Sequence, residues 1–562
     1  MLVLALLLPS AAFAKSAGSE VYRAPAEDLE KIKIEGLKNS KVMDTLGYLT
    51  EVIGPRLTNS PGMKRANEWT RDTMSKWGMS NAHLEAWGPF GRGWSLNRFS
   101  AQVVAPNALP VIAFPKAWSP STPGMVTGKV VKLEYKTAED LEKYKGKLKG
   151  AIVFISNKRP IKAGFKEIGH RFTDSELLAM ANAPDPSTMP RGRQGGNPIQ
   201  ARIQAFMKSF ALQNMAMNML IEEGAAVMVD NSRKGSGGTV FVSGASVGGP
   251  APTSIQDLFG GRNSAYQIGA EKNMVPQMTM STENYNQIAR MLKRGEEVTM
   301  SVNIDASYHD DDLMGYNTIA EIPGTDPALK DEIVMVGAHL DSWHAAGGAT
   351  DNGAGSAVAM EAARIILASG LKPRRTIRVA LWSGEEQGLN GSREYVKQHF
   401  GEMEGGGRFA AILGQKGKLT TKPDYEKFSA YYNMDNGTGQ FRGVYLQGNA
   451  AVADIFRAWL MPFDKILLGK DTKGNEIRGK STTTLTINNT SGTDHLSFDA
   501  IGLPGFQFIQ DPVEYSPLTH HSNQDNFDRI QAGDIKINST IMAAFVYQTA
   551  MMDQKIPRKS TP

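Results

Sequence analysis

The chain has 562 residues, of which 41% are hydrophobic and 21% are charged, so it is long enough for several domains and apolar enough for a large core. Its net charge of +5 is small for this length and no long basic run occurs, which argues against a nucleic-acid partner. Cysteine is absent, which excludes disulfides, thiolate metal ligands and a cysteine nucleophile.

The chain begins with a short apolar stretch, MLVLALLLPSAAFA, which ends in Ala-Phe-Ala before Lys15. This pattern is typical of a secretory signal peptide over residues 1–14, although a charged beginning is missing. No later run reaches the ~18 apolar residues that a transmembrane helix needs. We therefore expect an exported protein, periplasmic or extracellular, with no integral membrane segment in the mature chain. Residues 15–40 are polar, and we expect a mobile terminus there.

An amphipathic helix is predicted at residues 63–77. From about residue 118, proline and glycine interrupt the sequence more often. Short strands, a long methionine-rich helix and an apolar run follow, at 128–133, 151–156, 203–223 and 225–229. Residues 182–198 are rich in Pro, Gly and Asn, which predicts a segment without regular structure, either a loop that reaches over the site or a disordered excursion. We interpret residues 120–305 as a domain inserted between two parts of another, residues 15–119 and 306–562.

The most informative region is a predicted strand, helix and strand at 333–336, 356–368 and 377–382. Both strands are almost wholly apolar, as expected of parallel strands that are covered on both faces. Further strands are predicted at 430–434 and 505–509. The pattern indicates an α/β fold with a mixed central sheet flanked by helices, and such sheets place their sites at the carboxyl ends of the strands.

Residues suited to a metal site follow these strands. His339 and Asp341 come after the first, Glu385 and Glu386 after the second, and Asp351 lies in the glycine-rich loop between them. Imidazole and carboxylate donors together suit zinc best, and manganese or cobalt next. Asp341 projects on the same side of an extended chain as His339 and could hold its other ring nitrogen. One of two adjacent glutamates can bind metal while its neighbour stays free as a base.

Several motifs resemble, in order, the signatures of the co-catalytic zinc exopeptidases, in the branch of plasma glutamate carboxypeptidase (carboxypeptidase Q). They are Gly-Ala-His339-Leu-Asp341, Thr-Asp351-Asn-Gly, Gly-Glu385-Glu386-Gln-Gly, Asn-Met-Asp435, and His520-His521-Ser-Asn-Gln-Asp525. The resemblance covers most of the chain after residue 14, and it includes Gly54-Pro55-Arg56-Leu57 near the start and Ser491-Gly-Thr-Asp494-His495 near the end. It implies a zinc exopeptidase fold and identifies the inserted domain as similar to a protease-associated domain.

The resemblance also implies roles for single residues. It implies two zinc ions per chain, one held by His339, Asp351 and Asp435 and the other by Asp351, Glu386 and His521. It makes Glu385 the general base, with Asp341 beside it in the catalytic machinery. His520 takes the position of an oxyanion-stabilising residue, with a packing histidine as the alternative.

Three further expectations follow from the same resemblance. Asp494 and His495 are candidates for substrate binding. The Asp351-Asn352 peptide bond is expected to be cis. His344 stands where relatives carry an acidic residue, so it either contacts substrate or is an ordinary surface histidine.

The expected activity is metal-dependent hydrolysis of dipeptides or short peptides, in which a water activated at the metal pair attacks the peptide carbonyl. An aminopeptidase with the same site is the enzymatic alternative, and a non-catalytic binding protein on the same fold is the other. The sequence leaves the natural substrate, the physiological metal and the oligomeric state open, a homodimer included.

Overall fold

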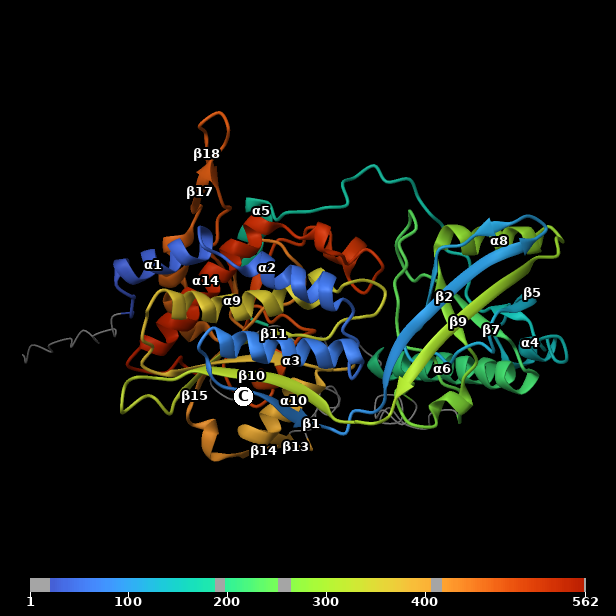
Figure 1. The fold of residues 1–562 in the computed structure, drawn as a ribbon, viewed down its shortest axis with the longest axis horizontal. Coiled ribbons are helices and arrows are strands. Elements are labelled where there is room, and N and C mark those ends of the chain that lie inside the picture. The colour runs from blue at the N-terminus through green and yellow to red at the C-terminus, as the bar shows by residue number, and fades with distance from the viewer. Residues whose placement is uncertain (1–20, 187–197, 251–263, 406–416, 560–562) are drawn as a thin grey trace, which may run out of the picture.

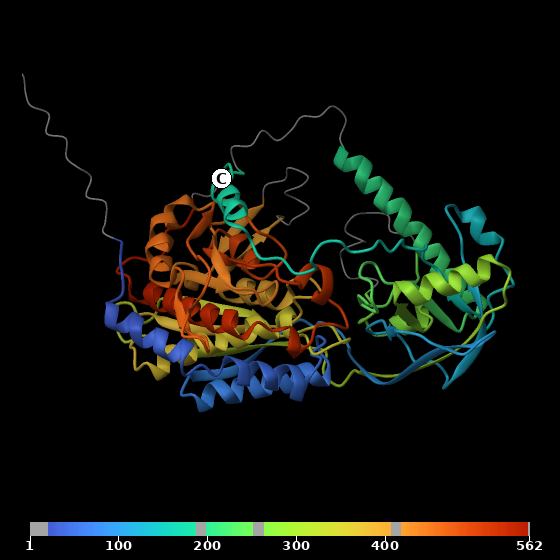
Figure 2. The same cartoon turned by 90° about the horizontal axis from the view of Figure 1, so that it is seen from above.

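The computed structural model describes residues 21–186, 198–250, 264–405 and 417–559, and the side chains of 198–203 are not described. The expected signal peptide at 1–14 and most of the 182–198 loop lie outside these ranges. The described chain forms two bodies side by side, each built on its own eight-stranded sheet (Figures 1 and 2). Among the described residues, no helix is long and apolar enough to cross a membrane.

The first sheet is mixed, with strand order β1-β10-β12-β11-β15-β20-β16-β19. Its strands are β1 (Ser80–Trp87), β10 (Gly315–Ile322), β11 (Ile333–His339), β12 (Thr376–Trp382), β15 (Phe428–Asn433), β16 (Phe441–Tyr445), β19 (Thr484–Thr486) and β20 (Gly505–Gln510). The central strands β12, β11, β15 and β20 run parallel to one another, whereas β1 and β10 add antiparallel at one edge. The predicted α/β class with a mixed central sheet is confirmed.

Helices cover both faces of this sheet, which explains why every residue of β11 is buried. Successive residues of the strand point to opposite faces of the sheet, so Val334 and Met335 belong to two separate apolar clusters. One face carries α1 (Ala26–Leu37), α2 (Val42–Gly47), α3 (Pro61–Lys76), α9 (Ala354–Ala368), α12 (Ala453–Leu460) and α14 (Ala532–Met551). The other carries α10 (Asn390–His399) and α13 (His495–Asp499).

The expectation of a mobile terminus over residues 15–40 is wrong for its described part. Helix α1 packs on α14, where Leu29 and Ile32 are buried. The Tyr547 hydroxyl donates a hydrogen bond of 3.0 Å to the Asp28 carboxylate. The polar residues that suggested mobility are the exposed face of an amphipathic helix.

The second sheet has strand order β3-β2-β9-β5-β6-β7-β8-β4. Its strands are β2 (Gly93–Ala105), β3 (Leu109–Pro110), β4 (Ala113–Pro115), β5 (Val126–Lys132), β6 (Ile152–Phe154), β7 (Val227–Asn231), β8 (Gln277–Met280) and β9 (Thr299–His309). Helices α4 (Ala138–Glu142), α6 (Pro198–Glu223) and α8 (Thr282–Lys293) belong to the same body (Figure 1). The long antiparallel pair β2 and β9 connects this body to the first sheet, so its sheet begins ahead of the expected boundary at residue 120.

One segment of the insertion crosses to the other body. Helix α5 (Asp174–Ala181) lies on the first body, although it follows β6 in the sequence (Figure 1). Arg171 anchors this excursion through ion pairs of 2.9 Å to Asp511 and 2.7 Å to Asp534. The remaining short pairs are β13 (Gly401–Glu404) with β14 (Lys418–Thr421) and β17 (Leu467–Lys470) with β18 (Glu476–Arg478).

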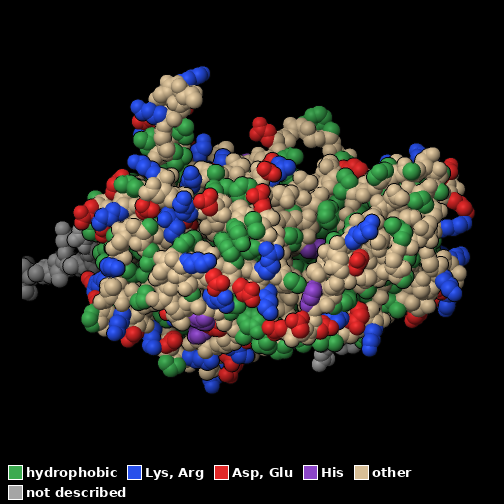
Figure 3. Space-filling view, in the orientation of Figure 1, with side chains coloured by type: hydrophobic (Ala, Val, Ile, Leu, Met, Phe, Trp, Pro, Cys, Tyr) green, Lys and Arg blue, Asp and Glu red, His purple; other side chains and the backbone are tan. Residues whose placement is uncertain are grey.

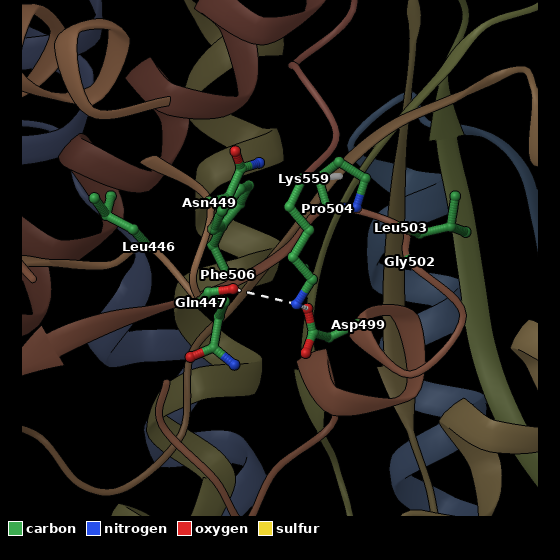
Figure 4. A pocket seen from close by; sticks show the side chains of 10 residues that line it. Leu446, Gln447, Asn449, Asp499, Gly502, Leu503, Pro504, Phe506 and Lys559 are labelled. Carbon is green, nitrogen blue, oxygen red and sulfur yellow. Dashed lines mark hydrogen bonds and ion pairs between the residues drawn. The ribbon is translucent and has the colours of Figure 1, made fainter. Parts of the chain in front are cut away.

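The C-terminal segment is fixed at a small pocket in the first body (Figure 4). Lys559 donates to the Gln447 carbonyl at 3.2 Å and forms an ion pair with Asp499. Pro504 and Phe506 add apolar walls to this pocket. The ion pair between Lys559 and Asp499 indicates a structural contact. The side chains suited to metal binding line a different pocket.

Candidate metal centre

Strand ends and loops far apart in the sequence meet at the carboxyl edge of the first sheet. Strands β11, β12 and β15 are parallel neighbours, so the residues that follow them lie at the same edge. The loop before α9 and the loop after β20 reach the same place. Seven titratable side chains gather there: His339, Asp351, Glu385, Glu386, Asp435, His520 and His521.

Asp351 lies between two histidines. Its Oδ1 is 3.5 Å from Nε2 of His339, and its Oδ2 is 3.2 Å from Nε2 of His521. Each histidine also faces a second carboxylate, because Nε2 of His339 is 3.5 Å from Asp435 and Nε2 of His521 is 2.9 Å from Glu386. The five predicted ligands therefore form two sets that share Asp351.

These separations fit divalent cations. Donor atoms ~2.0–2.1 Å from a tetrahedral zinc ion stand about 3.3 Å from one another, close to the spacing in both sets. Nε2 of His339 and Oε1 of Glu386 are buried and make no hydrogen bond within the described chain. Buried polar atoms are rarely left without a partner, and a cation in each set would supply one. The nitrogen and carboxylate donors are also the types that zinc accepts.

The loop that carries Asp351 is held from two sides. The Asp351-Asn352 peptide bond is cis, as predicted. The Asn352 side chain donates to the Met434 carbonyl at 2.8 Å, which ties this loop to the end of β15. The buried Asp525 carboxylate accepts the backbone N–H groups of Thr350 at 2.6 Å and Asp351 at 3.1 Å. Asp525 thus fixes the backbone from which the shared carboxylate projects.

Asp341 contacts His339 in a different way from the one expected. Nδ1 of His339 is 3.0 Å from the backbone carbonyl of Asp341 and 3.7 Å from its carboxylate, so the carbonyl is the acceptor. The carboxylate instead accepts the backbone N–H groups of Glu385 at 3.2 Å and Glu386 at 3.3 Å. The Thr58 hydroxyl donates to it at 2.9 Å. Asp341 therefore positions both adjacent glutamates.

The pKa shifts of the buried side chains at this site show that added positive charge would be favourable there. Burial raises the pKa of Glu385 well above its usual range, and the charges of Asp435 and Asp494 raise it further. Burial likewise raises the pKa of Glu386 to about 7. Burial lowers the pKa of His521, but the carboxylates around it prevail and raise it to about 10. Without a metal, burial therefore favours the protonated forms of Glu385 and Glu386, and bound cations would favour their charged forms.

His520 lies beside the second ligand set. Its ring centroid is 3.8 Å from that of His521 and 4.9 Å from that of Tyr515. One ligand atom from each of Asp351, His520 and His521 lies within 4.8 Å of the others. Burial lowers the pKa of His520 to about 4, so its ring is neutral at pH 7. A neutral imidazole at this position can donate a hydrogen bond to a substrate oxygen.

The other sequence candidates lie away from the open pocket. Asp494 and His495 are fully buried at the start of α13, and Asp494 acts on Glu385 through its charge. His344 is half-buried, and its Nε2 donates to the Pro115 carbonyl at 2.7 Å. The Trp94 ring packs edge-on against it at 5.3 Å. His344 therefore joins the two bodies.

Two residues with a clear structural role were not predicted. The Trp343 indole N–H donates to Oε2 of Glu386 at 2.7 Å. The buried Arg56 guanidinium donates to five backbone carbonyls, those of Leu49, Gly54, Leu340, Gly347 and Gly348. Their positions next to recognisable motifs were the only signals in the sequence. Arg56 holds the glycines that precede Asp351, and Trp343 orients a proposed ligand.

A loop of the second body reaches the same pocket, which no sequence pattern predicted. The backbone N–H of Val242 donates to the His521 carbonyl at 2.9 Å, and that of Asn523 donates to the Val240 carbonyl at 3.1 Å. Nη2 of Arg233 lies 3.3 Å from Nδ1 of His521. The pocket itself is lined by Trp343, Ala346, Gly348, Asp351, His521, Ser522 and Asp525. Histidine side chains reach the surface near the junction of the two bodies, where charges of both signs are interspersed (Figure 3).

The chain is similar to known peptidases. Residues 317–546 match the family model described as Peptidase family M28. Carboxypeptidase Q of Mus musculus is 24% identical over 539 residues, covering 96% of this chain and 91% of that protein. An aminopeptidase of Pseudomonas aeruginosa is 30% identical over 250 residues, covering 43% of this chain and 42% of that protein.

Solved structures show the same fold. A peptidase M28 precursor from Shewanella amazonensis superposes with a TM-score of 0.59 at 23% identity, over 95% of this chain and 99% of that one. A zinc aminopeptidase from Bacillus subtilis superposes with a TM-score of 0.51 at 16% identity, over 92% of this chain and 96% of that one. The sequence motifs, the matched family model and the shared fold agree: residues 317–546 are similar to peptidase family M28, and the chain is a metallopeptidase that hydrolyses peptide bonds.

Proposed function

We propose that the protein is a two-zinc exopeptidase that hydrolyses dipeptides or short peptides. The observation that carries this proposal is the position of Asp351, which presents one carboxylate oxygen to His339 at 3.5 Å and the other to His521 at 3.2 Å. A carboxylate shared in this way is suited to bridging two cations. His339 and Asp435 would complete one set of ligands, and Glu386 and His521 the other.

When bound, a pair of divalent cations lowers the pKa of a water molecule and stabilises negative charge on the substrate oxygen. The chain's own residues would move the protons. Glu385 takes the water proton and delivers it to the departing amine nitrogen. Its burial beside Asp435 and Asp494 makes it a strong proton acceptor. Asp341 keeps Glu385 in place through the backbone N–H.

His520 would donate a hydrogen bond to the substrate oxygen as negative charge develops there. Its low pKa supports this role, since a neutral ring adds no positive charge beside His521. Asp494 and His495 remain candidates for the substrate pocket, and they would form its floor behind Glu385 because both are fully buried.

The second body would complete the substrate pocket. We assign residues 120–305, together with strands β2, β3 and β4 that complete their sheet, to an inserted protease-associated domain, supported by this second sheet and by the contact of Val240 and Val242 with the loop of His521. The leader-like stretch at 1–14 supports export to the periplasm or the extracellular space.

The test combines metal analysis with a peptide panel. We expect the purified protein to hold two zinc ions per chain and to release amino acids from dipeptides only when they are bound. Protein with its full zinc content that hydrolyses no dipeptide or tripeptide would contradict the proposal.

An aminopeptidase with the same ligands is the alternative, supported by the similarity to the aminopeptidase of Pseudomonas aeruginosa. Peptides blocked at one end separate the two. An aminopeptidase cleaves peptides with an amidated carboxyl end and rejects acetylated ones, whereas a carboxypeptidase shows the reverse preference.

A further inference from the structure

A chain of buried hydrogen bonds crosses the first sheet and ends at one of the proposed metal ligands. The Trp382 indole N–H donates to the Tyr431 hydroxyl at 2.7 Å, and that hydroxyl donates to Oδ1 of Asn433 at 2.5 Å. Nδ2 of Asn433 donates to Oε1 of Gln507 at 2.9 Å, and Nε2 of Gln507 donates to the backbone carbonyl of Asp435 at 2.8 Å. All five residues are at most 3% exposed. The chain therefore connects the end of β12 to Asp435 through the interior of the protein.

The two ends of this chain fix the direction of every bond in it. An indole N–H can only donate and a backbone carbonyl can only accept, so each group between them accepts on one side and donates on the other. The chain crosses β11 at Gly337, where an added Cβ would lie 2.1 Å from the Ala380 carbonyl oxygen and 3.1 Å from the Tyr431 hydroxyl. Gly337 thus leaves the room that the chain needs. Turning over either side-chain amide would set two donors or two acceptors against each other, so the chain has a single arrangement.

The last bond of the chain determines where the Asp435 carboxylate points. The Asp435 carbonyl also accepts from Nε2 of Gln510, so two side-chain amides of β20 hold this peptide group. In a planar trans peptide, the C=O and the following N–H point in opposite directions. The N–H of Asn436 is thereby directed at Oδ1 of Asp435, to which it donates. The same oxygen lies 3.5 Å from Nε2 of His339, so the amides of β20 fix a proposed ligand atom through the backbone.

We propose that Gln507, and the chain behind it, are positioning residues for Asp435 as a metal ligand. The Gln507 side chain bonds to Asn433 and to the Asp435 backbone, and it does not line the open pocket, so it acts through Asp435. Asp435 belongs to only one of the two proposed ligand sets, whereas Asp351 belongs to both. Loss of the chain should therefore weaken one zinc ion and spare the other. This inference rests on the proposed function.

Zinc titrations of the metal-free protein by calorimetry test this selectivity. Gln507→Met keeps the length of the side chain and removes its donor. We expect one of the two zinc-binding steps to weaken about 10-fold, and about 100-fold when Gln510→Met is added, the range for residues that orient metal ligands. The other step should stay as in wild type. Gln440→Met is the matched control, because this buried glutamine donates to the Lys480 carbonyl at 3.0 Å and should leave both steps unchanged.

Two neighbouring tyrosines separate positioning from general stability. Tyr431→Phe breaks the chain at its centre and keeps the ring that stacks on Phe498 at 4.5 Å. Tyr432→Phe, on the opposite face of β15, removes an equally buried hydroxyl that is hydrogen-bonded to Thr549 at 2.7 Å. We expect each variant to lower the Tm of the metal-free protein, but only Tyr431→Phe to weaken the same zinc-binding step as Gln507→Met. Equal zinc affinities in the two tyrosine variants would overturn the role of the chain.

The wild-type titration separates this inference from the proposed function. Fewer than two zinc-binding steps in wild type would refute the two-zinc site, and the positioning role with it. Two steps in wild type that keep their affinities in Gln507→Met and in the double variant with Gln510→Met would refute the positioning role alone. Equal weakening of both steps would also overturn it, because that result indicates a general loss of the fold and not a displacement of Asp435.

Discussion

The Asp341 carboxylate accepts the backbone N–H of Glu385 at 3.2 Å, and this contact fixes the proposed base at the end of its strand. The second oxygen of Asp341 accepts the N–H of Glu386 at 3.3 Å. One buried carboxylate therefore sets the direction of two neighbouring glutamates, one of which faces His521. Because both hydrogen bonds go to backbone atoms, the two glutamate side chains stay free for metal and proton.

Asp341→Asn tests this positioning role. The amide would place an N–H group against one of the two backbone N–H donors, so the turn that carries Glu385 should shift. We expect kcat to fall by about 10²-fold or more and zinc affinity to fall about 10- to 100-fold, as for other residues that orient metal ligands. Activity assays at saturating zinc and zinc titrations measure the two effects separately. Wild-type kcat in a fully metal-loaded variant would contradict this role.

Glu385→Gln should retain metal and lose most turnover. The amide cannot accept the water proton, and general-base catalysis contributes about 10²- to 10⁴-fold. Zinc content and the temperature of thermal unfolding should stay close to wild type, because the side chain is not a proposed ligand. Glu404→Gln, at an exposed glutamate of β13, is the matched control and should keep full activity. An active, metal-loaded Glu385→Gln would refute the assignment.

The sequence predicted the parts of the site that depend on local chemistry. Strands β11 and β12 were predictable because uninterrupted apolar runs mark strands that are covered on both faces. The candidate ligands and base that come after these strands were predictable because sites lie at the carboxyl ends of parallel strands. The motif around Asp351 also predicted the cis peptide bond that the structure contains.

The remaining features depend on contacts that no local pattern encodes. Arg56 stands in a motif that resembles the family, but no local pattern shows that it is fully buried against five carbonyls. Arg233 is 288 residues from His521 in the sequence and meets it only because the second body folds against the first. Helix α1 was missed because its polar face dominates its composition while its few apolar residues pack on α14.

Removal of metal should destabilise the first body more than the second. Asp351, Asp435 and Glu386 are buried close together, and their charges repel without cations between them. A ligand at 100 times its Kd adds about 2.7 kcal/mol to the free energy of unfolding. We expect chelation to lower the Tm by several degrees and to raise hydrogen exchange around 349–353, with zinc restoring both. His339→Ala should reduce the zinc content and leave a smaller response to the chelator. A Tm that does not respond to chelation would argue against buried cation sites.

Arg56→Lys should loosen the loop that precedes Asp351. Lysine has three donors on a flexible stem, whereas Arg56 makes five hydrogen bonds to carbonyls, so at least two buried acceptors would lose their partners. Each unsatisfied group costs about 1–3 kcal/mol. We expect the free energy of unfolding to fall by about 2–6 kcal/mol and zinc to bind more weakly. Arg65→Lys, at a nearby exposed arginine, should cost little. Equal stability of both variants would show that the carbonyl contacts are dispensable.

His344 should make the junction between the two bodies sensitive to acid. Burial lowers the pKa of His344 to about 4 in the folded protein, whereas its pKa in the unfolded chain is about 6.5. The unfolded state therefore binds the proton more readily, and stability that is present above pH 6.5 is lost as the pH falls toward 4. The loss from this residue is at most about 3 kcal/mol.

His344→Gln separates this effect from that of the other histidines. The glutamine amide can still donate to the Pro115 carbonyl but does not titrate. Denaturant midpoints at pH 7 and pH 4.5, followed by the fluorescence of the tryptophans that flank His344, measure the difference. We expect wild type to lose more stability than the variant between these two pH values, and the two proteins to differ least at pH 7. If both lose the same amount, the junction tolerates a charged imidazole and His344 is not buried in solution.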